Sequence, residues 1–228
     1  MKKIDKVPQH CMYSATFNDD VMRFASQFVG SFVPFTIKKE ALKLKGVKNY
    51  RIGLSEEEKD DFVSELHEKL DKVMSMIFVN KKETAQKLQA RLKTGNITSH
   101  ILIGGIEPAE RDKIIDGFRK QQFNCLISTN VLARGIDVPE VDLVLNYDVP
   151  FTKECGFYHP DYANFMHRVG RTGRFGTDGL ALSMTSNETE EEAIDLIAKH
   201  YEIEIQALKS FEDLKNIMVE MRGSLFEQ

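Results

Sequence analysis

Length, composition and charge place the chain among globular proteins and exclude some function classes. At 228 residues, with 42% hydrophobic residues, it is long enough for one large domain, or for one domain with part of another. The formal net charge of −4 argues against nucleic-acid binding through bulk positive charge, so any contact with RNA must come from a local basic face.

The cysteines and the apolar runs indicate the cellular compartment and argue against a membrane-spanning segment. Cys11, Cys125 and Cys155 are widely spaced and form no Cys-x-x-Cys pair, so we expect neither a metal site nor a disulfide framework. The longest mainly apolar run, Met74 to Val79, is far too short to cross a membrane. The N-terminus lacks the apolar stretch of a signal peptide. We therefore expect a soluble intracellular protein with no membrane partner.

In chain order, residues 1–30 resemble the end of another domain. Ser14-Ala15-Thr16 ends a very short apolar run, and Asn18-Asp19-Asp20 offers N-cap residues for a helix. That helix carries apolar side chains on one face, at Val21, Phe24, Ala25, Phe28 and Val29. Very little of the domain to which this strand and helix would belong precedes them.

From Phe32 onwards, strand-like and helix-like segments alternate, which predicts an α/β fold with a mostly parallel sheet and helices on both faces. The expected strands are 47–54, 74–79, 97–103, 123–128, 141–147 and 179–185. The expected helices follow Ser55 and Asn80, or lie at 108–120, 161–169, 187–200 and 210–221.

Local signals fix several helix ends. Ser55 to Glu58 forms a capping box, and Asn80 to Glu83 is expected to cap the helix that Gly95 ends. Pro108 stands at a plausible N1 position. Because ligands of such sheets bind outside the carboxyl ends of the strands, the polar or glycine-bearing loops that follow them predict one functional edge. These loops contain Asn80, Gly104, Gly105, Thr129, Asn130 and residues 148–174.

The stretch His167 to Arg174 holds three arginines and two glycines. Arg171 and Arg174 are three residues apart, so if the segment opens a helix both guanidiniums share one face. Arginine forks match phosphate oxygens. Alone, the stretch also fits an ordinary solvated basic turn.

Together with Ser128 to Asp137, this stretch resembles motifs V and VI of the DEAD-box RNA helicases. Further stretches match the family in order: Ser14 to Thr16 (motif III), Ile77 to Asn80 (motif IV), and Glu110-Arg111-Asp112 followed by Phe118-Arg119. The resemblance implies a RecA-like fold. Residues 1–30 would be the tail of a first RecA-like domain with a linker, and residues 31–228 the helicase C-terminal domain.

The resemblance also implies roles in ATP hydrolysis. Arg171 and Arg174 match arginine fingers that reach the γ-phosphate, and His167 would link them to Ser14 and Thr16. An ordinary packing role for His167 stays open.

The motif V loop would serve the nucleotide. Asp137 matches the position that accepts a bond from the ribose of ATP, while Arg134 and Gly135 belong to the same loop. Mg²⁺ would be held by the absent first domain, and no metal site is expected here.

Five residues match RNA-contact positions of the family: Asn80, Lys81, Gly104, Arg111 and Thr129. Hydroxyl, amide and guanidinium groups hold an RNA backbone without reading its sequence. For the glycines alone, a plain strand-to-helix turn is an equal alternative.

The chain contains no Gly-x-x-x-x-Gly-Lys-Thr/Ser phosphate loop and no Asp-Glu-Ala-Asp run. We therefore predict that it does not hydrolyse ATP by itself. The long segment Phe151 to Met166 between motifs V and VI is similar to that of the mRNA-export DEAD-box subfamily. That likeness implies an export activator protein with an inositol phosphate, a nuclear pore component, and a location in the cytoplasm or nucleus.

Two other functions remain open. One is a non-catalytic RNA-binding or partner-docking module on the same fold. The other is a DNA helicase of the same superfamily, but the residues of motifs V and VI favour a DEAD-box RNA helicase.

Overall fold

The computed structural model describes residues 9–13, 19–29, 32–35, 46–70, 72–130, 141–154, 156–173 and 178–225. The chain divides into two compact units, residues 1–41 and residues 42–228. In the described part of the chain, no helix combines the length and apolar composition needed to cross a membrane.

The larger unit is built on a sheet of seven strands in the order β3-β4-β2-β5-β8-β1-β9, and all of its paired strands run parallel. Its strands are β1 (Val47–Gly53), β2 (Ser75–Val79), β3 (Ser99–Leu102), β4 (Cys125–Thr129), β5 (Leu143–Asn146), β8 (Gly179–Thr185) and β9 (Ile205–Ala207). A separate antiparallel hairpin joins β6 (Phe151–Glu154) and β7 (Phe157–Pro160).

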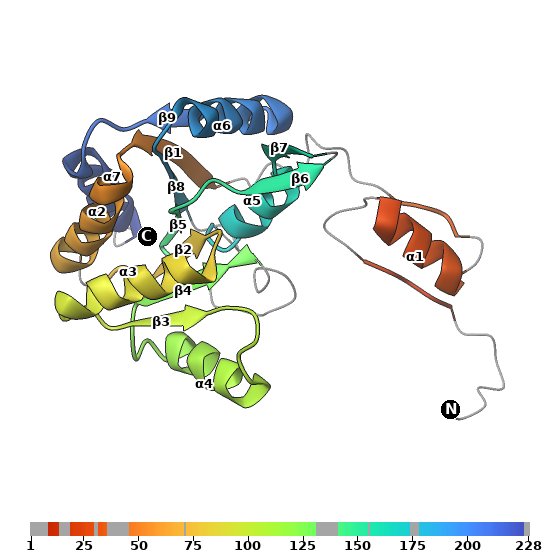
Figure 1. The fold of residues 1–228 in the computed structure, drawn as a ribbon, viewed down its shortest axis with the longest axis horizontal. Helices are drawn as coiled ribbons and strands as arrows, with labels where there is room; N and C mark the ends of the chain where they lie inside the picture. The colour runs from red at the N-terminus through yellow and green to blue at the C-terminus, as the bar shows by residue number, and fades with distance from the viewer. Residues whose placement is uncertain are drawn as a thin grey trace. The chain divides into compact units, whose positions relative to one another are not determined.

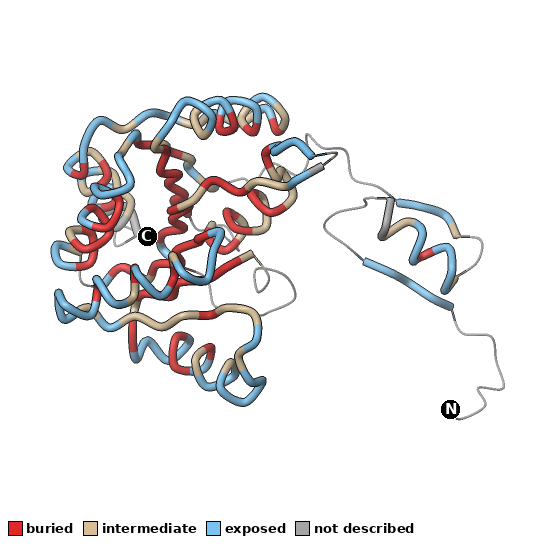
Figure 2. Tube along the Cα trace, viewed as in Figure 1, coloured by how far each residue is buried: buried red, intermediate tan, exposed pale blue. Residues whose placement is uncertain are grey.

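Helices cover both faces of this sheet (Figure 1). They are α2 (Glu56–Lys69), α3 (Lys82–Thr94), α4 (Pro108–Arg119), α5 (Tyr162–Val169), α6 (Glu188–Tyr201) and α7 (Phe211–Leu225). One buried cluster joins α2, α3 and α7 to one face of the sheet, and a second joins α4, α5 and α6 to the other. Figure 2 shows the buried sheet between these layers. The predicted parallel α/β fold is confirmed.

Strand β2 shows how the sequence makes this sandwich. Side chains alternate between the two faces of a strand, and Ile77 and Val79 join the first cluster while Met76 and Phe78 join the second. Since both faces are covered, the strand is apolar throughout apart from its first residue, Ser75.

Several local predictions are confirmed. Ser55 and Glu58 form the capping box, Pro108 is in the first turn of α4, and Gly95 caps α3. Strand β8 has the predicted bounds, Gly179–Thr185. The other predicted strands are one to three residues longer or shifted at their ends, and neither the hairpin nor β9 was expected.

The smaller unit contains one described helix, α1 (Asp19–Val29). Ala25 is its buried residue, whereas Phe24 and Phe28 are exposed and their ring centroids lie 4.6 Å apart. The helix therefore leaves much of its aromatic surface uncovered within its own unit. The assignment of residues 1–30 to a first domain stays a prediction.

Candidate functional site

The carboxyl ends of β2, β4 and β5 meet around Arg168, which lies near the end of α5 and is fully buried. Its guanidinium carbon lies 5.3 Å from the centroid of the Phe78 ring. An arginine is rarely buried unless its donors are satisfied. The identity of its acceptors therefore decides what this residue does.

Four acceptors satisfy the guanidinium of Arg168. Nε donates to Asn130 Oδ1 at 2.8 Å, and Nη2 donates to the same oxygen. Nη2 also donates to Asn80 Oδ1 at 2.9 Å, while Nη1 donates to Asn146 Oδ1 at 3.2 Å and to the carbonyl of Asp148 at 2.6 Å. One side chain thus ties together the loops that follow three parallel strands.

The charged guanidinium of Arg168 is hydrogen-bonded by uncharged acceptors. All four are amide or carbonyl oxygens. Burial lowers the pKa of Arg168 to about 9, while the negative charges of Asp148 and Asp161 work in the opposite direction, so the group stays charged at neutral pH. Burial also raises the pKa of Asp148, whose carboxylate accepts from the backbone N–H of Asn80 at 2.6 Å.

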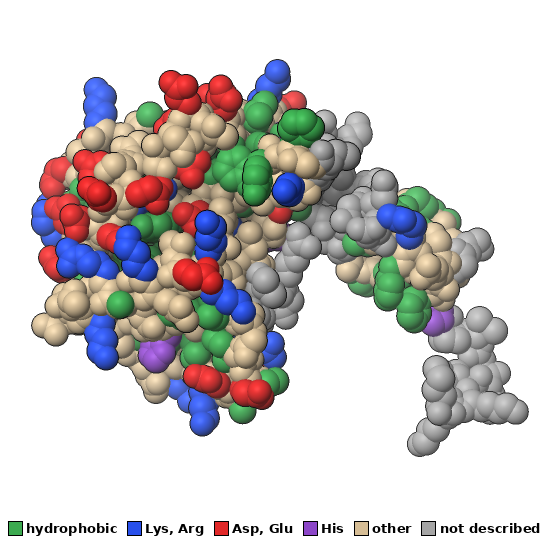
Figure 3. All heavy atoms as spheres, in the orientation of Figure 1, with side chains coloured by type: hydrophobic (Ala, Val, Ile, Leu, Met, Phe, Trp, Pro, Cys, Tyr) green, Lys and Arg blue, Asp and Glu red, His purple; other side chains and the backbone are tan. Residues whose placement is uncertain are grey.

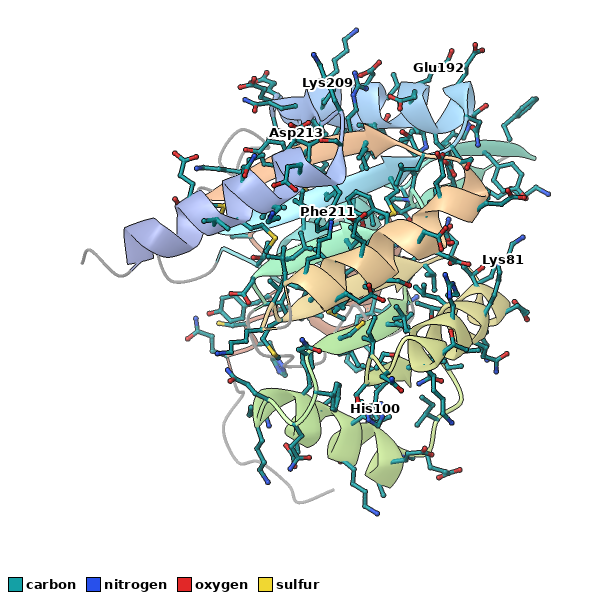
Figure 4. All side chains as sticks on the ribbon, turned by 90° about the vertical axis from the view of Figure 1, so that its left-hand side faces the viewer. Lys81, His100, Glu192, Lys209, Phe211 and Asp213 are labelled. Carbon is teal, nitrogen blue, oxygen red and sulfur yellow. The ribbon has the colours of Figure 1, made fainter. Side chains whose placement is uncertain are left out.

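Asn80 does not cap α3, contrary to the prediction. Its side-chain amide donates to the carbonyl of Val149 at 2.8 Å, and its oxygen accepts from Arg168. The N-cap residue of α3 is Lys81, which makes no side-chain capping hydrogen bond. The expectation that Asn80 caps the helix is therefore wrong, because its two polar groups serve the loop after β5. Lys81 is exposed and points outwards at the start of α3 (Figure 4).

Thr129 ends β4 next to this network. It is 5% exposed, and its hydroxyl has no hydrogen-bond partner among the described residues. The neighbouring hydroxyl of Ser128, in contrast, donates to the carbonyl of Leu102 at 3.0 Å. A buried hydroxyl without a partner costs stability, and it leaves Thr129 with an unused donor and acceptor at the edge where ligands of such sheets bind.

The turn after β3 contains Gly104 and Gly105, and Gly105 has a φ of +95°. A Cβ built at Gly105 would lie 3.8 Å from Lys82 Nζ, so the turn faces the first residue of α3. Arg111 is partly exposed one turn into α4, with its Nε 3.9 Å from Asp112 Oδ1. Two basic side chains thus accompany a backbone turn that a ligand could approach closely.

The turn that holds Arg171 is fixed against the sheet. Helix α5 ends at Val169, so Arg171 follows the helix rather than opening one, which corrects the premise about its spacing. The carbonyl of Arg171 accepts from Val141 N at 3.2 Å, and the hydroxyl of Thr172 donates to the carbonyl of Val141 at 2.5 Å. Gly173 has a φ of +68°, and a Cβ there would lie 2.5 Å from Val47. Arg171 is thereby held in place with only 9% of its surface exposed.

His167 lies on α5 one residue before Arg168 and is partly buried. The remaining predicted site residues lie outside the described residues: Ser14, Thr16, Arg134, Gly135, Asp137 and Arg174.

Sequence reasoning missed Asn146, and it gave no role of their own to Arg168 and Asp148, which lie in the predicted functional segment 148–174. A signal was present in α5, because Phe165, Arg168 and Val169 have the spacing of one helix face and the other two are apolar. An arginine on an apolar face needs acceptors in the interior. The loop after β5, with Asn146 and Asp148, supplies them.

The sequence matches the profile of the family described as "Helicase conserved C-terminal domain" over residues 58–176. It is also similar to ATP-dependent RNA helicase DBP5 of Lodderomyces elongisporus, with 42% identity over 205 residues. That match covers 88% of this chain and 40% of the relative, so the chain spans less than half of the relative's length.

The structure is also similar to solved structures of the DEAD-box protein Dbp5. Saccharomyces cerevisiae Dbp5 bound to RNA and ADP BeF3 has a TM-score of 0.80 and 33% identity, covering 92% of this chain and 53% of that one. The C-terminal domain of the DEAD-box protein Dbp5 has a TM-score of 0.70 and 35% identity, covering 78% and 99%. A variant of S. cerevisiae Dbp5 bound to Nup159, Gle1, IP6 and ADP has a TM-score of 0.71 and 30% identity, covering 92% and 54%.

Proposed function

Because the chain belongs to the helicase conserved C-terminal domain family, as the C-terminal RecA-like domain of a DEAD-box protein, we propose that it forms one wall of a cleft that binds ATP and RNA. The first RecA-like domain forms the other wall. Bound RNA and ATP close the two domains on each other, and hydrolysis with phosphate release reopens them. The exposed Phe24 and Phe28 of α1 support the assignment of residues 1–30 to that first domain.

On the nucleotide side, Arg171 and Arg174 act as arginine fingers towards the γ-phosphate. A finger must be held in position before the transition state forms, because positioning and charge stabilisation supply most of the catalysis in phosphoryl transfer. The hydrogen bonds that fix the turn of Arg171 support this role. We assign His167, Ser14 and Thr16 to the coupling of ATP hydrolysis to RNA binding.

The motif V loop completes the nucleotide site. Asp137 accepts a hydrogen bond from the ribose, and Gly135 and Arg134 shape the loop around it. Mg²⁺ would supply positive charge to offset the negative charge of the phosphates. We assign its ligands to the first domain.

On the RNA side, Thr129, Gly104, Lys81, Arg111 and Asn80 contact the phosphodiester backbone. The partnerless hydroxyl of Thr129 supports this role, because a phosphate oxygen would satisfy it. Contacts of this kind position an RNA strand and carry little sequence information. We therefore expect binding that depends weakly on RNA sequence.

The observation that carries the proposal is the network of Arg168. Through Asn130 it holds the entrance of the proposed nucleotide loop, and through Asn80 it holds the proposed RNA loop. It lies three residues from Arg171 on the same segment. A single rigid group thus connects the three elements that RNA-dependent ATP hydrolysis must coordinate.

The decisive experiment measures RNA-stimulated ATP hydrolysis by the full-length protein and by its Arg171→Ala and Arg174→Ala variants. We expect turnover to fall by about 10³-fold or more in each variant, while binding of a fluorescent ATP analogue persists. Arg91→Ala is the matched control, because Arg91 is an exposed arginine paired with Asp61 at 2.8 Å and lies outside the motifs. Turnover that matches the wild type in both finger variants would refute the assignment. The pure 228-residue chain should show no turnover.

The relatives suggest the cellular setting. Dbp5 structures contain Nup159, Gle1 and IP6, and we propose that the full-length protein remodels RNA–protein complexes in mRNA export at the nuclear pore. Its partners would then be an activator protein with an inositol phosphate, and a pore component. Pull-down of the full-length protein with Gle1, with and without IP6, tests this setting.

The second candidate is a non-catalytic RNA-binding or docking module on the same fold. The buried, pinned turn of Arg171 favours the enzyme, because a binding surface has no need to hold an arginine with little exposure beside the sheet. The finger variants separate the two functions: a docking module loses no turnover.

A further inference from the structure

The β6–β7 hairpin presents aromatic side chains to solvent. Phe157 and Tyr158 are each 71% exposed. In the antiparallel register Phe157 pairs with Glu154, and Tyr158 pairs with Lys153. Because neighbouring residues of a strand point to opposite faces, the two rings lie on different sides of the hairpin. Figure 3 shows hydrophobic side chains gathered over it.

The base of the hairpin is firmly held. Pro160 is buried and Phe151 packs against the second core cluster. The backbone N–H of Asp161 donates to the carbonyl of Pro150 at 2.8 Å, which closes the hairpin at its open end. Asn80, a proposed RNA contact, donates to the carbonyl of Val149 just before it. The exposed rings therefore project from a hairpin whose base is fixed by packing and hydrogen bonds, one of them from Asn80.

Position and charge favour a nucleic acid as the ligand of these rings. The hairpin follows β5 and projects from the edge at which β3 and β4 end (Figure 1). Lys153 Nζ lies 5.7 Å from the centroid of the Tyr158 ring, so a cation accompanies the aromatic surface. Aromatic rings beside basic side chains bind single strands by stacking on bases while the cation meets the phosphates.

We propose that the β6–β7 hairpin is a base-stacking site for single-stranded RNA, with Phe157 and Tyr158 as platforms and Lys153 as a phosphate contact. The inference rests on the proposed function, in which Thr129 and its neighbours hold the strand by its phosphates. A strand held by its backbone leaves its bases free. A base beyond that segment can then stack on the hairpin, which extends the binding site past the backbone contacts.

The test uses the complete 228-residue chain and two fluorescent probes of equal length: oligouridylate, and the same ribose-phosphate backbone without bases. Stacking requires bases, so the wild type should bind oligouridylate more tightly. Phe157→Ala and Tyr158→Ala should each weaken that binding by about 10-fold and leave the abasic probe unaffected. Tyr158→Phe retains the ring and should retain the binding. Leu196→Ala and Val219→Ala are matched controls, because both residues are exposed and apolar on other elements.

A Thr129→Val variant separates this inference from the function on which it rests. It should weaken binding of both probes to a similar extent, because a backbone contact does not depend on bases. If Thr129→Val has that effect and the hairpin variants bind oligouridylate like the wild type, the stacking site is refuted and the RNA site stands. A hairpin that instead serves a protein partner gives this same result. If the chain binds neither probe, both proposals fail.

Photocrosslinking gives an independent readout. A 5-iodouridine in the oligonucleotide should crosslink to Phe157 or Tyr158, as identified by mass spectrometry of the digested chain. Crosslinks found only at other residues would overturn the proposal.

Discussion

Two buried cations lie beneath the same edge of the sheet, and they are satisfied in different ways. Arg168 donates to amide and carbonyl oxygens on the loops after β2, β4 and β5. Lys59 lies in the first turn of α2, with Nζ 2.8 Å from Glu56 Oε1 and 3.7 Å from Glu190 Oε2. Both cations are fully buried. One is held by uncharged loop oxygens and the other by carboxylates at the starts of two helices.

Arg168 supports the proposed site, whereas Lys59 supports only the packing around it. The acceptors of Arg168 belong to loops that carry proposed RNA and nucleotide contacts, so moving Arg168 moves the site. The acceptors of Lys59 lie in the first turns of α2 and α6, which contain no proposed site residue. Lys59 also lies 5.4 Å from the centroid of the Tyr147 ring, and the hydroxyl of Tyr147 donates to Asp60. We therefore expect Lys59 to affect only the packing of helices on the sheet.

The largest effect should follow from Arg168→Met. The substitution removes the donors of four buried or half-buried acceptors at once, and breaking a buried charged network typically costs about 3–5 kcal/mol. Denaturant unfolding followed by circular dichroism measures the loss. Arg91→Met is the matched control, because Arg91 is exposed and pairs with Asp61 at 2.8 Å, a contact worth at most about 1 kcal/mol.

Arg168→Lys tests the same site for function. Lysine keeps the charge but lacks the planar fork that reaches several acceptors. RNA-stimulated turnover of the full-length protein should therefore fall even where the fold survives. If Arg168→Lys hydrolyses ATP as fast as the wild type, the network is only structural and the contrast with Lys59 disappears.

Periodicity predicted most of the sheet but not its connections. Strand β8 and the capping box of Ser55 depend on local pattern, since a buried parallel strand is apolar throughout and a cap is read from four residues. The β6–β7 hairpin has no such pattern. Its base is held because Phe151 packs against the second core cluster and Pro160 is buried, and tertiary packing of this kind cannot be recognised in the local sequence.

The candidate site divides in the same way. Motif spacing predicted that Asn80, Thr129 and the segment of Arg171 belong to one edge, because parallel strands bring their carboxyl ends together. It did not predict the burial of Arg168, because arginine is among the residues least often buried and only its position on the apolar face of α5 indicated it. Its burial depends on acceptors from loops that meet only when β2, β4 and β5 are side by side.

Between pH 7 and pH 5 Arg168 stays charged, so a change in stability over this range reports other buried groups. His67 is buried, with Nδ1 2.9 Å from the carbonyl of Val63 and Nε2 2.8 Å from Ser75 Oγ. Burial lowers the pKa of His67 below its usual value, so below about pH 6.5 the unfolded chain binds a proton that the folded chain refuses. Stability should fall as pH drops from 7 to 5, with a slope approaching about 1.4 kcal/mol per pH unit.

The control for the pH series is His67→Gln, which removes the titrating group. Its free energy of unfolding should be lower at pH 7 but less dependent on pH than that of the wild type. An equal slope in both proteins would assign the pH dependence to other groups.

The smallest effect should follow from Lys59→Met. Methionine fills a similar volume, and losing an ion pair whose carboxylate faces solvent costs at most about 1 kcal/mol. Glu56 is 63% exposed and is solvated without its partner, while Glu190 still accepts from Ser186 N at 2.8 Å. We expect the free energy of unfolding to change by less than about 1 kcal/mol and RNA-stimulated turnover to be unchanged. A loss of turnover in Lys59→Met with stability preserved would show that the helix starts of α2 and α6 act on the site, and the division of the edge into two halves would then be wrong.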